Sequence, residues 1–130
     1  MAMTAEQIYP KVQQVLEDAL GVDAEEITPK AALIEDLGME SIDALDIVFR
    51  LEKAFSIKIP RGELFPENLP ELMADARFVT DGKLTADGVA ELKRRMPFAD
   101  FAALEGNPTV EQAKRLLNVD TVVRFVQSKL

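Results

Sequence analysis

Apolar residues near both ends of this chain recur at intervals of three and four, the spacing of one face of an α-helix. A stripe of this kind is stable only when it is buried against other elements. The residues are Ile8, Val12, Val15, Leu16, Ala19 and Leu20 near the N-terminus, and Val119, Val122, Val123 and Val126 near the C-terminus. Most other segments also read as helices, so the sequence predicts an all-α fold.

The boundaries of the first two helices can be predicted from capping residues. Thr4 followed by Gln7 is typical of a capping box, and Gly21 predicts the end of the first helix. Pro10 conflicts with a straight helix, so either the helix bends there or its regular part begins near Pro10. A long loop should follow. The second helix is predicted over about 41–55, with Pro60 as a stop and with one apolar face formed by Ala44, Ile47, Val48, Leu51 and Phe55.

Residues 61–108 contain shorter predicted elements. Asn68 is a plausible cap for one short helix, and the pair Asp81-Gly82 between apolar stretches indicates a tight turn or small hairpin. Thr85 predicts the start of another helix. Gly88 weakens this prediction, because glycine disfavours the interior of a helix. Residues 97–108 predict at most one further helical turn, and two helices in close succession should complete the chain.

The composition limits the classes of function. The chain has 130 residues, 48% of them hydrophobic, enough for a single packed domain, and no apolar run approaches the ~18 residues of a membrane span. The lack of cysteine fits a cytoplasmic protein. The net charge is −8, and residues 1–60 hold 12 acidic but only 5 basic side chains. This excess disfavours nucleic acid and predicts a protein partner with a basic surface.

Known catalytic and metal-binding patterns do not fit this chain. Histidine and cysteine are both absent, which excludes a histidine-based triad. The segment around Gly82 is similar to part of an EF-hand, but Arg77 and Val79 occupy positions that require acidic ligands. Gly88 stands where a bidentate glutamate is needed. We therefore predict no calcium site and no histidine-based catalytic residue.

Ser41 at the predicted start of the second helix has two interpretations. Serine is a common helix cap, and on physical grounds alone a cap is favoured. The free N–H groups and positive dipole end of a helix also favour a phosphate there, by about 0.3–1 kcal/mol.

The segment DLGMESIDALDIVFRLEKAFSIKIP resembles the signature of the acyl carrier proteins. Asp36, Leu37 and Gly38 match the turn of that family, and Asp43 matches the acid that follows its modified serine. The resemblance implies that Ser41 receives a 4′-phosphopantetheine arm from coenzyme A. It also implies that the chain is no enzyme and has no catalytic residue of its own, with partner enzymes supplying the catalysis. Glu40 and Ile42 replace the usual aspartate and leucine that flank the serine, which could weaken recognition by a given transferase.

The same resemblance implies a four-helix bundle with an enlarged middle. The core would comprise residues 1–60 and 109–130 of a single domain, with a mainly helical insertion at 61–108 before the third helix. Some longer members deliver very-long-chain acyl groups to lipid A, and the sequence is similar to these over about a third of its length. The insertion either shelters a longer chain, creates a partner-specific surface or decorates the same core.

The resemblance also implies a set of site residues and partners. The partners would be a phosphopantetheinyl transferase and acyl synthases and acyltransferases with basic docking surfaces, acting on a monomeric carrier. Its partner-binding surface is predicted to contain Asp36, Glu40, Asp43, Leu45, Asp46, Phe49 and Glu52. Its acyl-chain lining is predicted to contain Ile42, Ile47, Leu51 and Val122. The alternatives are a carrier for polyketide or peptide synthesis, and an unmodified helical interaction protein.

Overall fold

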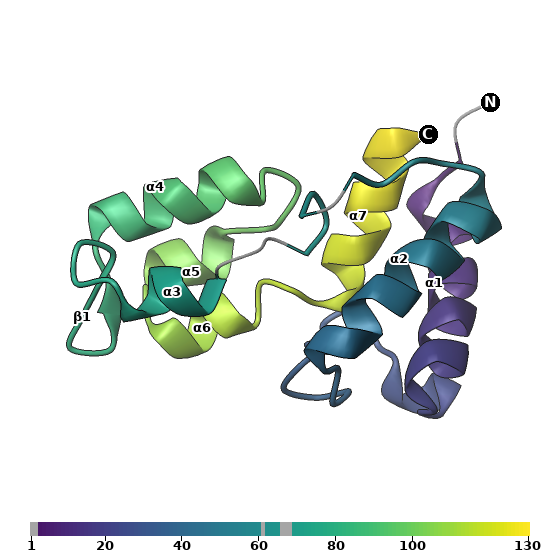
Figure 1. The fold of residues 1–130 in the computed structure, drawn as a ribbon, viewed down its shortest axis with the longest axis horizontal. Helices are drawn as coiled ribbons and strands as arrows, with labels where there is room; N and C mark the ends of the chain where they lie inside the picture. The colour runs from purple at the N-terminus through teal and green to yellow at the C-terminus, as the bar shows by residue number, and fades with distance from the viewer. Residues whose placement is uncertain (1–2, 61, 66–68) are drawn as a thin grey trace.

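A computed structural model describes residues 3–60, 62–65 and 69–130, and at Ser41, Leu69 and Pro70 it describes the backbone. The all-α fold class is confirmed, since the only strands in the described part form a two-stranded hairpin. Figure 1 shows two lobes. The first, here called the carrier lobe, consists of α1 (Ala5–Leu20), a short 3-10 helix (Ala24–Glu26), α2 (Ser41–Phe55) and α7 (Val119–Lys129).

The second, here called the insertion lobe, contains the remaining elements. They are α3 (Leu69–Ala74), β1 (Val79–Thr80), β2 (Lys83–Leu84), α4 (Ala86–Arg95), α5 (Ala102–Gly106) and α6 (Val110–Lys114). The predicted short helix and hairpin are both present, although the predicted cap at Asn68 lies outside the described residues. None of the helices in the described part of the chain combines the length and apolar character that a bilayer span requires.

Helix α1 begins where its capping box predicts. The Thr4 backbone N–H donates to the Gln7 side chain at 2.9 Å, and the Gln7 N–H donates to the Thr4 hydroxyl at 3.3 Å. Gly21 ends the helix in the left-handed conformation, at φ 68°. Pro10 lies inside the helix on its exposed side. The alternative of a helix beginning near Pro10 is therefore wrong, because the capped first turn precedes the proline.

The core of the carrier lobe lies where α1 packs against both α2 and α7. Each helix turns its apolar stripe inward, and burial of one such aliphatic side chain contributes about 1.5–3 kcal/mol. The core side chains include Ile8, Val12 and Leu16 of α1, Ile47 and Leu51 of α2, and Val122, Phe125 and Val126 of α7. The first and last helices of the chain thus hold the lobe together.

Helix α6 lies with the insertion lobe, beside α5 (Figure 1). The hairpin explains this position. Asp81 and Gly82 form its turn with φ values of 52° and 75°, as expected for an Asp-Gly pair. The Leu84 N–H then donates to the Pro108 carbonyl at 2.7 Å, and the Val110 N–H donates to the Gly82 carbonyl at 3.0 Å. The first residue of α6 is therefore fixed to the hairpin.

The two lobes share an apolar contact and an ion pair at α7. The ring of Phe98, after α4, meets the ring of Phe125 in α7 edge-on, with 5.0 Å between centroids. Arg124 of α7 lies 3.9 Å from Asp100, and Lys129 of α7 pairs with Glu63 in the connection between α2 and α3. The buried side chains of both lobes form one continuous cluster.

Position 88 in α4 has room for glycine but not for a residue with a side chain. A Cβ atom added there would lie 2.2 Å from the carbonyl oxygen of Phe78. Ala favours helices over Gly by about 1 kcal/mol, but this overlap with backbone should cost more, about 1–3 kcal/mol net. We expect Gly88→Ala to lower the free energy of unfolding in urea. Gly106→Ala is the matched control, because a Cβ there meets no atom within 4 Å; equal effects would contradict the assigned overlap.

Candidate functional site

The turn before α2 is fixed by buried side chains and backbone hydrogen bonds. Leu33, Leu37 and Met39 are buried and anchor the loop to the core. The Met39 N–H donates to the Leu33 carbonyl at 2.8 Å, which closes the turn. Gly38 has a φ of 72°, a backbone conformation that residues other than glycine rarely adopt. This turn directs the chain into the first residue of α2.

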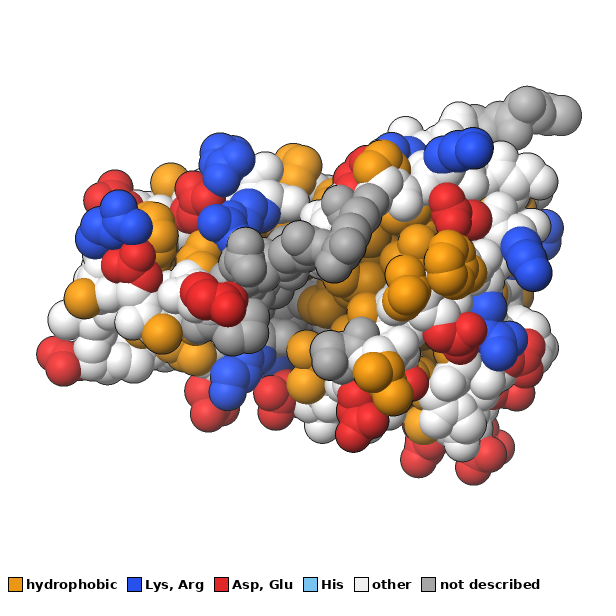
Figure 2. Space-filling model, viewed as in Figure 1, with side chains coloured by type: hydrophobic (Ala, Val, Ile, Leu, Met, Phe, Trp, Pro, Cys, Tyr) orange, Lys and Arg blue, Asp and Glu red, His pale blue; other side chains and the backbone are white. Residues whose placement is uncertain are grey.

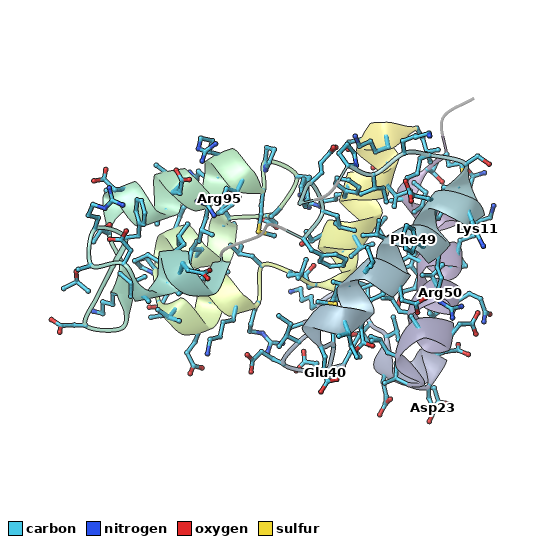
Figure 3. All side chains as sticks on the ribbon, viewed as in Figure 1. Lys11, Asp23, Glu40, Phe49, Arg50 and Arg95 are labelled. Atoms are coloured by element: carbon cyan, nitrogen blue, oxygen red, sulfur yellow. The ribbon has the colours of Figure 1, made fainter. Side chains whose placement is uncertain are left out.

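Ser41 is the first residue of α2, as predicted, and Glu40 is the residue that caps the helix in an extended conformation. The Asp43 carboxylate accepts a hydrogen bond from the Glu40 N–H at 2.9 Å, and the Asp43 N–H donates to the Glu40 carbonyl at 3.0 Å. Figure 3 labels Glu40 at this end of the helix. Asp43 therefore stabilises the helix start as well as adding negative charge.

The beginning of α2 is open to an approaching protein. Glu40 is exposed and the side chain of Ile42 is 76% exposed. Backbone N–H groups in the first turn of a helix lack helical partners and favour an anionic group. Hence the backbone at Ser41 occupies a position that suits a phosphate-linked group and that an enzyme could reach.

An apolar strip runs along the exposed side of α2. It consists of Ile42, Leu45 and Phe49, which are 76%, 60% and 54% exposed and follow one another at spacings of three and four. Figure 2 shows apolar side chains at the surface over α2, bordered by acidic and basic groups. Three large apolar side chains in solvent on one helix are typical of a protein-binding surface.

The acidic residues around this strip also bind groups of the protein itself. Asp46 accepts a hydrogen bond from Arg50 at 2.9 Å, one turn further along the helix. Glu52 accepts from the Ile59 N–H at 3.0 Å and thereby fixes the chain after α2. The predicted acidic surface is therefore partly neutralised by Arg50, whose position beside Phe49 is seen in Figure 3.

Asp36 is held by two donors on the same oxygen. Its Oδ2 accepts from the Ala32 N–H at 2.8 Å and from the Arg115 guanidinium at 2.7 Å. The hydrogen bond from Ala32 and that from Arg115 both lower the pKa of Asp36 below its usual value. The Asp36 carboxylate therefore stays ionised over the ordinary pH range.

Arg115 is a site residue that the sequence did not reveal. It lies 79 positions from Asp36 and follows α6, and no local pattern connects the two. Backbone bonds bring the segments together. The Leu33 N–H donates to the Leu117 carbonyl at 3.0 Å, and the Val119 N–H donates to the Ala31 carbonyl at 3.1 Å.

The residues predicted to line an acyl chain lie in two different places. Ile47, Leu51 and Val122 are fully buried in the core of the carrier lobe, whereas Ile42 is at the surface. In the insertion lobe, Leu72, Leu92 and Met96 are buried in the same continuous cluster. The lining assignment stays a prediction, and for Ile42 it requires a conformational change.

Comparison with known proteins identifies the family. The family described as "Phosphopantetheine attachment site" matches residues 10–75. An acyl carrier protein of Rubrobacter xylanophilus is 43% identical over 61 residues, covering 47% of this chain and 75% of that protein. The acyl carrier protein AcpXL of Mesorhizobium japonicum is 35% identical over 85 residues, which cover 65% of this chain and 80% of that protein. The AcpXL protein of Brucella melitensis is 46% identical over 52 residues, which cover 40% of this chain and 56% of that protein. The chain belongs to the acyl carrier protein family.

Membership of this family defines the cofactor and the class of activity. Acyl carrier proteins are carriers and not enzymes, and their cofactor is a covalently bound 4′-phosphopantetheine. The group supplies a flexible thiol that holds acyl chains as thioesters. The exposed helix start at residues 40–42 fits such a group, because its backbone N–H groups favour phosphate and neighbouring side chains leave access to solvent.

Proposed function

We propose that Ser41 is the residue that carries the phosphopantetheine arm. The observation that carries this proposal is its position: the first residue of a 15-residue helix, after a turn fixed by Gly38 and Met39. The family match over residues 10–75 includes this serine. The other two serines of the chain lie at the C-terminal ends of α2 and α7, where the helix dipole disfavours a phosphate.

Intact-mass spectrometry tests this proposal. The protein is incubated with coenzyme A, magnesium and a broad-specificity phosphopantetheinyl transferase, and the mass is measured before and after. We expect the addition of one arm. No addition to the folded protein, with a dedicated transferase also tried, would favour an unmodified interaction protein.

Partner enzymes should dock on α2 through the apolar strip and the acids around it. Asp43 and Asp46 lie on the same helix as Ser41, Leu45 and Phe49, and Glu40 directly precedes that helix. Charge of this kind accelerates the association of oppositely charged partners more than it tightens the final complex. The transferase and the acyl-handling enzymes would therefore present basic surfaces, and salt should weaken their docking.

Reversing two of these charges tests the docking surface. We expect Asp43→Lys combined with Asp46→Lys to lower the kcat/KM of arm transfer at least tenfold at low salt, because two attractions become repulsions. Asp87→Lys is the control, since Asp87 is also an acid in the first turn of a helix, α4 in the insertion lobe. Thermal unfolding of each variant measures any loss of stability from removal of the Asp43 carboxylate, which accepts the Glu40 N–H. An unchanged kcat/KM in the double variant would exclude this surface.

The acyl group is proposed to be a very long chain, with transfer to lipid A as its destination. The similarity to the Mesorhizobium AcpXL protein supports the first part. An aligned stretch of 85 residues in a chain of 130 must include residues 46–85, wherever it begins. The similarity therefore extends into the insertion, which ordinary short carriers lack.

The insertion would lengthen an apolar shelter for that chain. Ile47, Leu51 and Val122 would separate to admit it, and buried side chains of the insertion lobe would continue the wall through Leu72 and Leu92. Val89 and Met73, which are half-buried, would add to it, while the Leu69 side chain lies outside the described part. The two lobes already share one apolar cluster, so a chain that enters the first could extend into the second.

A series of acyl chains on the holo protein tests the shelter. Each buried CH₂ group contributes about 0.8 kcal/mol, so the thermal unfolding temperature should rise from short to very long chains. The unacylated holo protein is the reference. Equal stabilisation by a medium and a very long chain would contradict the extended shelter and would favour a partner-specific surface.

A further inference from the structure

The ion pair between Asp36 and Arg115 joins the turn before Ser41 to the segment after α6. The Arg115 guanidinium lies 2.7 Å from Asp36 Oδ2, and the two side chains are 45% and 40% exposed. Both hydrogen bonds to Asp36 end on Oδ2, so the guanidinium neutralises the carboxylate without enclosing it. The pair is thus partly exposed at the surface, and Asp36 lies five residues before Ser41 in the chain.

Backbone hydrogen bonds on both sides of Arg115 hold this part of the chain in place. Helix α6 is held by the hairpin, since the Val110 N–H donates to the Gly82 carbonyl. The residues after Arg115 are bound to the loop before α2, as Ala32 and Asn118 form an antiparallel bridge and the Asp120 N–H donates to the Pro29 carbonyl at 2.8 Å. The backbone of both segments is therefore fixed, and the ion pair needs little ordering to form.

We propose that Arg115 is a specificity-determining residue for docking, because it places a positive charge of the α6–α7 connection on the acidic surface beside Ser41. This inference rests on the proposed function. A basic partner approaching the start of α2 meets Glu40 and Asp43 but finds Asp36 neutralised. Arg115 therefore lowers the attraction for partners that need all three acids, and it favours partners whose cations lie over α2 alone.

Removal of this charge should improve docking. We expect Arg115→Gln to raise the kcat/KM of arm transfer by a broad-specificity phosphopantetheinyl transferase about two- to fivefold at low salt. The change should appear in KM with kcat unchanged, and it should vanish at high salt because the effect is electrostatic. Arg115→Lys keeps the charge and should behave like the wild type.

Arg124→Gln is the matched control. Arg124 has a similar exposure of 49%, lies in an ion pair with Asp120 at 3.1 Å and loses the same charge on substitution. It lies on α7 and its ion pairs are with Asp120 and with Asp100 of the insertion lobe, not with Asp36. A general gain from lower positive charge would appear in both variants, whereas the proposed effect appears in Arg115→Gln alone.

A double-mutant cycle with Asp36→Asn completes the test, because asparagine keeps an acceptor for the Ala32 N–H. If Arg115 acts through Asp36, the gain from Arg115→Gln should be absent in the Asp36→Asn background. An Arg115→Gln variant with the unfolding temperature and KM of the wild type would overturn this inference alone. Failure of the wild type to accept an arm would overturn the proposed function, and this inference with it.

Discussion

Ser41→Ala should keep the mass of the unmodified protein after incubation with coenzyme A and a phosphopantetheinyl transferase, whereas the wild type should gain one arm. The effect is all-or-none, because the hydroxyl oxygen is the atom that would form the phosphodiester. The fold should survive the change, since the turn before α2 is held by Met39, Leu37 and backbone bonds, and the helix start is held by the hydrogen bond from the Glu40 N–H to the Asp43 carboxylate. Intact-mass spectrometry and thermal unfolding of both proteins measure the two quantities.

Ser128→Ala is the control for this experiment. Ser128 donates to the Phe125 carbonyl at 2.6 Å near the end of α7, where it has no proposed role in modification. This variant should gain the arm like the wild type. An arm on Ser41→Ala would place the attachment elsewhere and would overturn the assignment of the site, while leaving membership of the family untouched.

Phe125→Ala should destabilise the protein by about 3–5 kcal/mol, the largest effect we expect from a single substitution outside the site. The Phe125 ring is almost fully buried in α7 and packs edge-on against Phe98. Its removal would leave a cavity at the contact between the two lobes. Urea unfolding followed by far-ultraviolet circular dichroism measures the change.

Phe49→Ala provides the matched comparison, because this phenylalanine is 54% exposed on α2. Its free energy of unfolding should change by no more than about 0.5 kcal/mol. If Phe125→Ala had an equally small effect, the lobes would be joined by something other than this ring contact. A second transition in the Phe125→Ala curve alone would indicate that the insertion lobe unfolds separately once the contact is lost.

Local sequence patterns predicted most of the elements, since each depends on residues close together in the chain. The capping box at Thr4, the hairpin turn at Asp81 and the cap at Thr85 are all where they were expected. Helix α2 has the predicted bounds because its apolar face and the turn before it agree. Pro10 was ambiguous because the capping signal and the proline signal conflict within one segment.

The features that the sequence did not predict depend on distant residues. Gly88 looked like a weakness in α4, but it gives room to the carbonyl of Phe78. The pairing of Asp36 with Arg115 spans 79 positions, and the position of α6 beside the insertion depends on a bond to Gly82. Periodicity gives the face of a helix that is buried, but not the element that covers it.

The packing of α7 on α1 has a consequence for how the chain folds. The first helix meets the last across about 100 intervening residues, and closing a loop of that length costs conformational entropy before any contact rewards it. The part of the apolar face of α1 that packs against α7 thus stays uncovered on the ribosome until the final helix has emerged, whereas α2 can cover the rest earlier. We expect this carrier to fold more slowly than helical proteins of the same size with local contacts. The insertion contributes residues 61–108 to that separation and therefore lengthens the time before α7 can pack on α1.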